Sequence, residues 1–166
     1  MKKYKLILLF VLTVVLMLQA GCKKESQVTH EDAAIAIQEE FQLLMGKDAE
    51  ITNPVIATLS DGFSVEIISI DKNKDVYTVK CILSNYDTIA AFKAINEIGG
   101  EMSLDEYAQL MVDILTQQER CIMETKIPLT ILDDGRYQAT FNEEQLDAAL
   151  GGFISYYNQL LEGVAE

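Results

Sequence analysis

The chain has 166 residues, the length of one domain or at most two, and 49% of them are apolar, as in ordinary globular proteins. Its 13 Lys and Arg residues stand against 26 Asp and Glu residues, so the formal net charge is −13. A surface this acidic repels phosphate and effectively excludes nucleic acid as a partner. With one His and three Cys in the whole chain, a zinc site of the usual Cys/His kind is nearly excluded as well.

The first 21 residues have the layout of an export signal peptide. Three Lys residues lie within residues 1–5, and an apolar run from Leu6 to Leu18 follows, interrupted only by Thr13. As a helix this run would be about 20 Å long, whereas the apolar core of a bilayer is about 30 Å thick. The run therefore predicts a signal peptide, with an uncleaved anchor helix as the alternative.

The end of this segment, Leu18-Gln19-Ala20-Gly21-Cys22, resembles the lipobox of bacterial lipoproteins. The resemblance implies cleavage in front of Cys22, attachment of a diacylglyceryl lipid to its sulfur, and residues 22–27 as a short tether. The alternative is ordinary cleavage after Ala20, which leaves a free thiol. The first interpretation places the protein outside the cytoplasm, held at the outer face of the cytoplasmic membrane by two acyl chains.

Residues 28–166 are expected to form a single α+β domain that begins with a helix. Thr29-x-x-Asp32 resembles a capping box, and Gly46 is expected to end the helix. Apolar residues fall on one face of it at helical spacing: Ala34, Ile37, Phe41 and Leu44. Residues 47–62 contain the turn signals Asn53-Pro54 and Ser60-Asp61-Gly62 and are expected to be irregular.

Four segments rich in β-formers predict two antiparallel hairpins. Residues 63–70 and 76–83 are joined by a loop at residues 71–75, and residues 121–132 and 136–141 by the turn Asp133-Asp134-Gly135. Pro128 lies within the third of these strands, and its missing N–H predicts an edge position or a bulge.

Three further helices are predicted. Asn85 or Asp87 caps a helix through Ile98, in which Ile89, Phe92 and Ile95 are expected to be buried. The capping box Ser103-x-x-Glu106 opens a helix to about Glu119, with an apolar stripe of Leu104, Tyr107, Met111, Ile114 and Leu115.

Asn142 caps the final helix, which carries the strongest apolar pattern of the chain. The stripe is Leu146, Ala149, Leu150, Phe153, Tyr157 and Leu160, and Gly151-Gly152 lies inside it. We expect this helix to continue, straight or kinked, across the glycines, which would allow close backbone packing. We also expect the strands to pack their apolar faces against it, which makes Phe153 and Tyr157 core residues.

Two stretches resemble a known family of exported domains. Ile127 to Tyr137, followed by a capped helix that contains Ala-Leu-Gly-Gly152, looks like the C-terminal end of cystatin-like or nuclear-transport-factor-two-like domains, and Val79 to Asp87 resembles another strand of that family. Such domains are common in lipoproteins of Gram-positive bacteria. The resemblance implies a small antiparallel curved sheet wrapped on a helix, sometimes with a pocket, and it carries over no catalytic residue.

The sequence offers few candidates for a metal site. Asp71-x-Asn73-x-Asp75 imitates the opening of a calcium loop, but Val76 and Ile82 stand where that loop requires Gly and Glu. His30, the single imidazole, lies in the first turn of a helix next to the tether, where we expect it to be solvated. We therefore expect no metal ligand and no cofactor other than the lipid on Cys22.

A nucleophilic or acid–base site is equally hard to assemble from the sequence. Cys81 and Cys121 lie far along the chain from His30, so neither has an evident base. We expect both to be packed, unreactive thiols, with a disulfide between them as the alternative. An Asp/Tyr acid–base pair, as in isomerases of the cystatin-like fold, could be present, but most of the seven Tyr residues are expected in the core.

These observations favour a membrane-anchored, extracytoplasmic lipoprotein that acts as a non-catalytic binding or interaction module. Its expected partners are the membrane, through the lipid anchor, and a protein at the cell surface. The alternative is a pocket-containing enzyme or a carrier of a small apolar ligand, since one fold hosts many functions.

Overall fold

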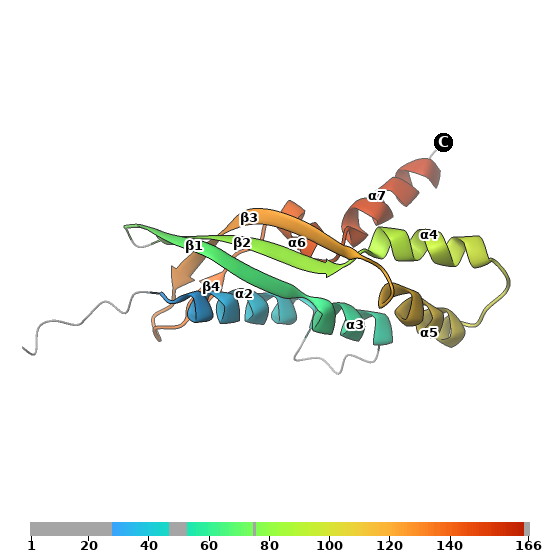
Figure 1. Ribbon diagram of the computed structural model, residues 1–166, viewed down its shortest axis with the longest axis horizontal. Coiled ribbons are helices and arrows are strands. Elements are labelled where there is room, and N and C mark those ends of the chain that lie inside the picture. Colours follow the sequence, from blue (N-terminus) through green and yellow to red (C-terminus); the bar gives the residue numbers. More distant parts are fainter. Residues whose placement is uncertain (1–27, 47–52, 75, 165–166) are drawn as a thin grey trace, which may run out of the picture.

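The computed structural model describes residues 28–46, 53–74 and 76–164, and in these residues it has an α+β architecture (Figure 1). The described helices are α2 (His30–Leu44), α3 (Pro54–Gly62), α4 (Thr88–Ile98), α5 (Leu104–Leu115), α6 (Glu143–Ala149) and α7 (Phe153–Val164). The strands are β1 (Ser64–Asn73), β2 (Val76–Tyr86), β3 (Arg120–Ile131) and β4 (Tyr137–Ala139). They form one open antiparallel sheet in the order β1-β2-β3-β4.

The predicted hairpins are present, and the first is tighter than expected. Asn73 of β1 pairs with Val76 of β2, so Lys74 and Asp75 alone connect the strands, instead of the expected loop at residues 71–75. β2 also continues to Tyr86, beyond its expected end. The second hairpin turns as expected at Gly135, which adopts a φ of 85° that suits glycine.

Pro128 lies where the fourth strand no longer pairs with the third. The β3–β4 pairing begins at Leu129 and Ala139, and the carbonyl of Pro128 accepts a hydrogen bond from the backbone N–H of Thr140 at 3.2 Å. The proline therefore faces the region just beyond the end of β4, where its missing N–H removes no ladder hydrogen bond. This confirms the expected edge position.

The sheet packs mainly against α2, and of the expected last helix it is the first part, α6, that contacts β2 and β3. The inward residues of β2 and β3 form one buried cluster with α2: Tyr77, Val79, Cys81, Leu83, Ile127 and Leu129 against Ala33, Ala36, Ile37 and Phe41. Both edge strands, β1 and β4, contact α2, so the sheet curves around this helix (Figure 1). Ala149 of α6 joins the same cluster.

Helix α2 begins as the capping box predicted. The Thr29 hydroxyl accepts a hydrogen bond from the backbone N–H of Asp32, and the Asp32 carboxylate accepts one from the backbone N–H of Thr29 at 3.0 Å. Ile37 and Phe41 are fully buried as expected, whereas Leu44 is half-exposed because the helix ends beyond the edge of the core.

The segment expected to be irregular contains helix α3. The Asn53 side chain accepts hydrogen bonds from the backbone N–H groups of Val55 and Ile56, and Pro54 occupies the first turn, where its missing N–H costs nothing. The Asn-Pro pair thus starts a helix and does not mark a turn. Residues 47–52 lie outside the described residues.

The final helix is broken where we expected it to continue. Gly151 and Gly152 adopt φ values of 65° and 87°, and the chain forms two helices, α6 and α7. The Asp147 carboxylate accepts hydrogen bonds from the backbone N–H groups of Ile154 at 2.7 Å and Ser155 at 3.0 Å, so it caps the start of α7 across the break.

This break also overturns the expected burial of the C-terminal aromatic residues. Phe153 is 37% exposed and Tyr157 is 52% exposed, because α7 diverges from the sheet and projects beside α4 (Figure 1). Helix α5 also differs from the prediction. It ends at Leu115, before the expected end at about Glu119, and Leu104 of its expected apolar stripe is 88% exposed.

Candidate functional site

An apolar groove of about 680 Å³ lies among the helices at the end of the molecule opposite to the start of α2. We call it the helical groove. Its walls come from α3, α4 and α5, with contributions from the C-cap of α2 and the α6–α7 turn. Its lining residues are Met45, Asn53, Pro54, Val55, Ile56, Leu59, Thr88, Phe92, Leu104, Asp105, Tyr107, Ala108, Met111, Leu115, Leu150 and Phe153.

A second, smaller apolar cluster forms the floor of the helical groove. It consists of Leu59, Ala91, Ile95, Met111 and Leu115, and it joins α3, α4 and α5 to one another. Helix α5 is positioned by the predicted capping box, in which the Ser103 hydroxyl accepts from the backbone N–H of Glu106 and the Glu106 carboxylate accepts from the backbone N–H of Ser103 at 2.9 Å. The groove therefore sits on a packed base.

A buried polar joint holds the helices of the groove onto the sheet. Asn85, at the end of β2, is fully buried, and its amide donates hydrogen bonds to the carbonyls of Leu59 at 2.9 Å and Ala149 at 2.7 Å. Asn85 therefore ties α3 and α6 to the strand. It does not cap α4, a role that the Asp87 side chain performs by accepting from the backbone N–H of Ala90 at 2.8 Å.

The α6–α7 turn closes against the same joint. The Thr88 hydroxyl and backbone N–H both donate to the carbonyl of Gly151, at 2.6 and 3.0 Å. A Cβ atom on Gly151 would lie 1.8 Å from the backbone oxygen of Tyr86, so this approach requires glycine. The expectation that the glycines allow close packing is confirmed, although the helix does not continue through them.

Aromatic side chains line one side of the groove. Phe92 stacks on Tyr156 with ring centroids 5.1 Å apart and lies 5.8 Å from Phe153. The Asn96 amide donates a hydrogen bond to the Tyr156 hydroxyl at 3.1 Å. These contacts hold the half-buried Phe92 in a fixed position in the wall of the groove. Of the three α4 residues expected in the core, Ile95 is buried, whereas Phe92 and Ile89 are half-buried.

The polar residues of the lining do not form an acid–base pair. Asn53 caps α3 and Thr88 binds the α6–α7 turn, so their side chains are engaged in structure. Asp105 and Tyr107 are two residues apart on α5, a spacing at which helical side chains do not face each other. Burial, and secondarily the nearby Tyr156, raises the pKa of Tyr107, so its hydroxyl stays protonated at neutral pH.

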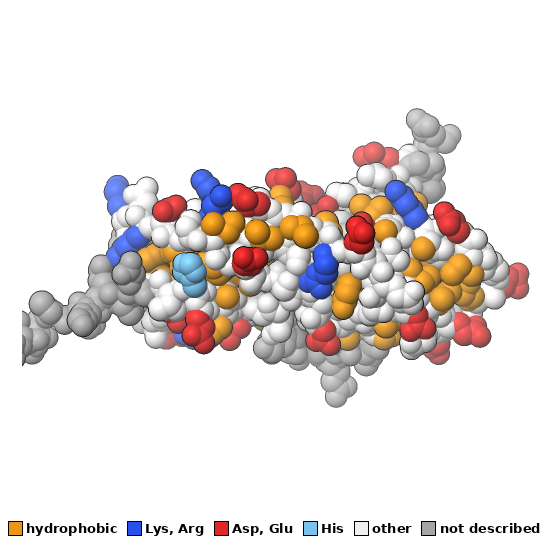
Figure 2. All heavy atoms as spheres, viewed as in Figure 1, with side chains coloured by type: hydrophobic (Ala, Val, Ile, Leu, Met, Phe, Trp, Pro, Cys, Tyr) orange, Lys and Arg blue, Asp and Glu red, His pale blue; other side chains and the backbone are white. Residues whose placement is uncertain are grey.

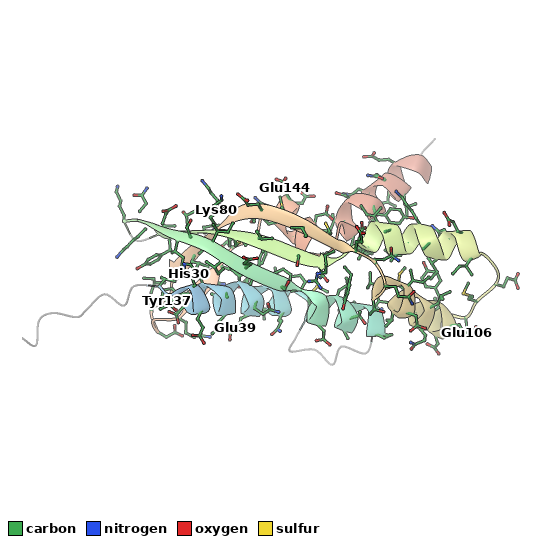
Figure 3. All side chains as sticks on the ribbon, viewed as in Figure 1. His30, Glu39, Lys80, Glu106, Tyr137 and Glu144 are labelled. Carbon is green, nitrogen blue, oxygen red and sulfur yellow. The ribbon has the colours of Figure 1, made fainter. Side chains whose placement is uncertain are left out.

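The groove does not include the residues weighed in the sequence analysis as possible metal ligands. Cys22 lies outside the described residues. His30 is exposed at the start of α2, and Figure 3 shows it at the opposite end of the molecule from Glu106 of α5. Asp71 and Asn73 are exposed in β1, and Asp75 is outside the described residues. Within residues 28–46, 53–74 and 76–164, no three His, Cys, Asp or Glu side chains gather as a possible metal site.

The two thiols of the domain are free. In the sheet register Cys81 pairs with Thr125, and Cys121 pairs with Asn85, four residues further along β2. That offset is about 13 Å, well beyond the roughly 7 Å that a disulfide tolerates between Cα atoms. Burial raises the pKa of Cys81 to about 11, and it also raises that of Cys121, with Asp87 and Asp147 adding to the effect. Both cysteines were expected to be packed in the core. Cys81 is buried as expected, whereas Cys121 is half-buried.

Sequence reasoning missed the helical groove because its walls were interpreted as core. The sequence predicts burial for Ile89, Phe92 and Ile95 and an apolar stripe from Leu104 to Leu115, and it does not distinguish a core from the wall of a groove. Three separate segments build the groove, and their convergence depends on the buried joint. The signal that was available is the surplus of apolar residues on three short helices, more than one small core can cover.

The comparisons with known proteins give no relative for this chain. No family model, no curated protein and no solved structure matches it. Separately, none of the helices in the described part of the chain combines the length and the apolar character needed to cross a membrane.

Proposed function

We propose that this protein is a lipid-anchored, extracytoplasmic binding module that acts without catalysis and uses the helical groove as its binding site. The observation that carries the proposal is the groove itself: a half-open, predominantly apolar surface on a packed base, whose polar lining is largely engaged in holding the fold. Concave apolar sites with few polar groups are the usual form of small-molecule sites, and apolar grooves also receive amphipathic helices.

The anchor is supported by the N-terminal sequence. A basic start, a short apolar run and small residues before Cys22 are the elements that lipoprotein processing requires. With Cys22 lipidated, residues 23–27 would span at most about 18 Å, so the domain would lie close to the outer face of the cytoplasmic membrane. The described part of the chain starts at Val28, at the end of the molecule remote from the groove, so the groove would face away from the membrane (Figure 1).

The domain is proposed to be cystatin-like on the basis of its sheet and α2. A single long helix followed by an antiparallel meander, with both edge strands in contact with that helix, supports this interpretation. Helices α4 and α5 are then an insertion between the two hairpins, and together with α3 they supply the groove.

A small apolar ligand is the second candidate occupant, and the groove volume favours it. About 680 Å³ falls within the roughly 300–1,000 Å³ typical of small-molecule sites. In that case the protein would be a carrier of the ligand, or an enzyme whose reacting groups lie in the lining of the groove. The ligand would co-purify with the full chain.

The experiment that tests the proposed function uses photo-crosslinking in cells. A photoreactive phenylalanine analogue replaces Leu104 at the groove rim, and in a matched control it replaces Ile122 on the open face of the sheet; the two side chains are 88% and 67% exposed. We expect a specific adduct from position 104 alone. Equal labelling from both positions, together with no small molecule in the native mass spectrum of the extracted chain, would reject the groove as the binding site.

The anchor is tested separately by Cys22→Ser. We expect the variant to leave the lipid-modified membrane fraction and to incorporate no labelled palmitate, whereas Cys121→Ser behaves like the unmodified chain. Unchanged fractionation and labelling of Cys22→Ser would show that the lipid anchor is absent.

A further inference from the structure

We propose that the occupant of the helical groove is a cationic amphipathic helix of a partner protein. This inference rests on the proposed function of the groove and adds the chemistry of the partner. Two independent features of the described residues support it: apolar surface that continues outside the groove, and acidic residues with almost no basic residue among them in the helices that form the groove.

The apolar surface of this region extends beyond the groove lining. Leu104 at the rim is 88% exposed, Ile98 of α4 is 56% exposed, and Tyr157 of α7 is 52% exposed and stacks on the groove residue Phe153 with centroids 6.3 Å apart. Figure 2 shows hydrophobic side chains at this end of the molecule as a patch on the visible face. Exposed apolar surface of this kind is typical of protein interaction sites.

Negative charge surrounds this apolar surface. Residues 87–119, which include α4 and α5, contain seven Asp and Glu residues and one basic residue, Lys93. Among the groove-lining residues the charged one is Asp105. The sheet region is acidic as well, but it also carries basic residues, among them Lys80, which pairs with Glu124 at 2.6 Å, and Arg136, which pairs with Asp134 at 2.7 Å. Figure 2 shows acidic side chains spread around the helical end. A partner with Lys or Arg beside its apolar residues complements this rim.

The same charge argues against other occupants. A second copy would bring two acidic rims together, which is unfavourable at an interface. An anionic membrane surface would be repelled in the same way. The groove also lies at the end of the molecule opposite to Val28, where the tether to the proposed anchor begins, so the anchoring bilayer is remote from it (Figure 1).

The shape of the groove suits a helix better than an extended chain. Its walls are helices, and among the described residues around it there is no strand edge, so it offers no ladder for β-augmentation. An amphipathic helix binds such a groove by inserting apolar residues spaced at i, i+3 or i+4, and i+7. Lys and Arg on the flanks of that helix would then lie next to Asp105 and the acidic residues of α4 and α5.

The test measures peptide binding to the full chain in a non-ionic detergent. The probes are a synthetic amphipathic helix with Leu on one face and Lys on the other, and the same helix with every Lys replaced by Glu. We expect the Leu/Lys helix to bind at least about tenfold more tightly at low salt, with the difference shrinking as salt screens the charges. Fluorescence anisotropy of labelled peptides gives both affinities.

Variants locate the interaction. Ala108→Trp fills the groove and should abolish binding, and Leu104→Ser, which changes an 88% exposed side chain, should weaken it without affecting the fold. Asp105→Lys should reduce the affinity for the Leu/Lys helix about two- to fivefold, the usual range for one exposed ion pair. Glu144→Lys is the matched control, because Glu144 is also acidic and in the first turn of a capped helix, but lies over the sheet (Figure 3).

The outcomes separate this inference from the proposed function. Equal affinity for the two peptides, or equal effects of Asp105→Lys and Glu144→Lys, overturns the cationic partner. A small molecule that co-purifies with the chain and is lost in Ala108→Trp, with no binding of either peptide, overturns the partner helix and retains the groove as a site. Insensitivity of all binding to Ala108→Trp and Leu104→Ser rejects the groove, and with it the proposed function.

Discussion

The sheet region and the helical region of this domain bury apolar residues to different degrees. Around the sheet, Phe41, Leu83 and Ile127 are completely buried between α2 and the curved strands. Around the helical groove, five buried residues form a thin base, while Leu104, Phe153 and Tyr157 remain in contact with solvent. Large apolar side chains are also exposed around the sheet, Ile122 at 67% among them, but in the helical region the exposed ones adjoin a groove, which makes this region available for binding.

The largest loss of stability is expected from a substitution in the joint between these two regions. Gly151→Ala places a Cβ atom 1.8 Å from the backbone oxygen of Tyr86, at a residue whose φ is 65°. Because backbone cannot move aside cheaply, we expect a loss of at least about 4 kcal/mol in the free energy of unfolding, an exceptional value for one substitution. Urea denaturation of the full chain measures it.

The matched control is Gly99→Ala. Gly99 has nearly the same φ, 61°, but no atom lies within 4 Å of its added Cβ. We expect a cost of about 1–3 kcal/mol from backbone strain alone. Equal stability of the two alanine variants would contradict the close packing of the α6–α7 turn against β2.

Two phenylalanines compare the regions directly. Phe41→Ala removes a fully buried side chain that lies 4.1 Å from Phe63 between ring centroids, and should cost about 3–5 kcal/mol. Phe153→Ala removes a side chain that is 37% exposed and should cost clearly less. Urea midpoints of the two variants give the order, and a larger loss for Phe153→Ala would show that α7 is packed into a core in solution.

A substitution of the buried Asn85 tests whether its side chain holds α3 and α6 on β2. Asn85→Ala removes the side-chain donor from the buried carbonyl of Ala149 and one of two donors from that of Leu59, which keeps its hydrogen bond from the Phe63 backbone N–H. The unsatisfied Ala149 carbonyl alone costs about 1–3 kcal/mol, and the effect should appear as faster hydrogen exchange in α3 and α6 before the sheet. Asn96→Ala, which removes a half-exposed contact to Tyr156, is the control and should leave the exchange of α3 unchanged.

The smallest expected effect concerns two capping boxes that contain a carboxylate, the one at Thr29 beside the sheet and the one at Ser103 in the helical region. Hydrogen bonds from Thr29 lower the pKa of Asp32 below its ordinary value of 3.8, and those from Ser103 lower that of Glu106 below 4.5. A lowered folded-state pKa means that this stabilisation is complete above the ordinary value and is lost as the pH falls through the folded value. We therefore expect Asp32→Asn and Glu106→Gln to flatten the loss of stability below about pH 4.5. An unchanged acid limb in both variants would show that these caps do not contribute.

Local signals in the sequence predicted the parts of the fold that depend on neighbouring residues. The caps at Thr29, Ser103 and Asn142 and the turn at Gly135 were all recognisable, because each is made by residues a few positions apart. The strands were recognisable from their content of β-forming residues and from the loops between them. The Asn53-Pro54 pair was ambiguous, since the same dipeptide starts a turn or a helix, and the chain uses it for the helix.

The site depends on contacts between distant residues, and this is why the sequence did not predict it. The break at Gly151-Gly152 becomes stable because Asp147 caps α7 from seven residues upstream of Ile154 and because Thr88, 63 residues away, holds the Gly151 carbonyl. An apolar stripe has the same pattern whether it faces a core or a groove, so Phe153 and Leu104 could not be separated from Phe41 by spacing alone.

The most direct test of the central claim is hydrogen exchange of the full chain with and without the Leu/Lys helix. The account predicts slow exchange in β2 and β3 in both samples, faster exchange in α3 and α5 without the peptide, and new protection in α3, α4 and α5 when it is bound. Protection confined to the open face of the sheet, or no change in the three groove helices at saturating peptide, would contradict the assignment of the helical region as the binding region.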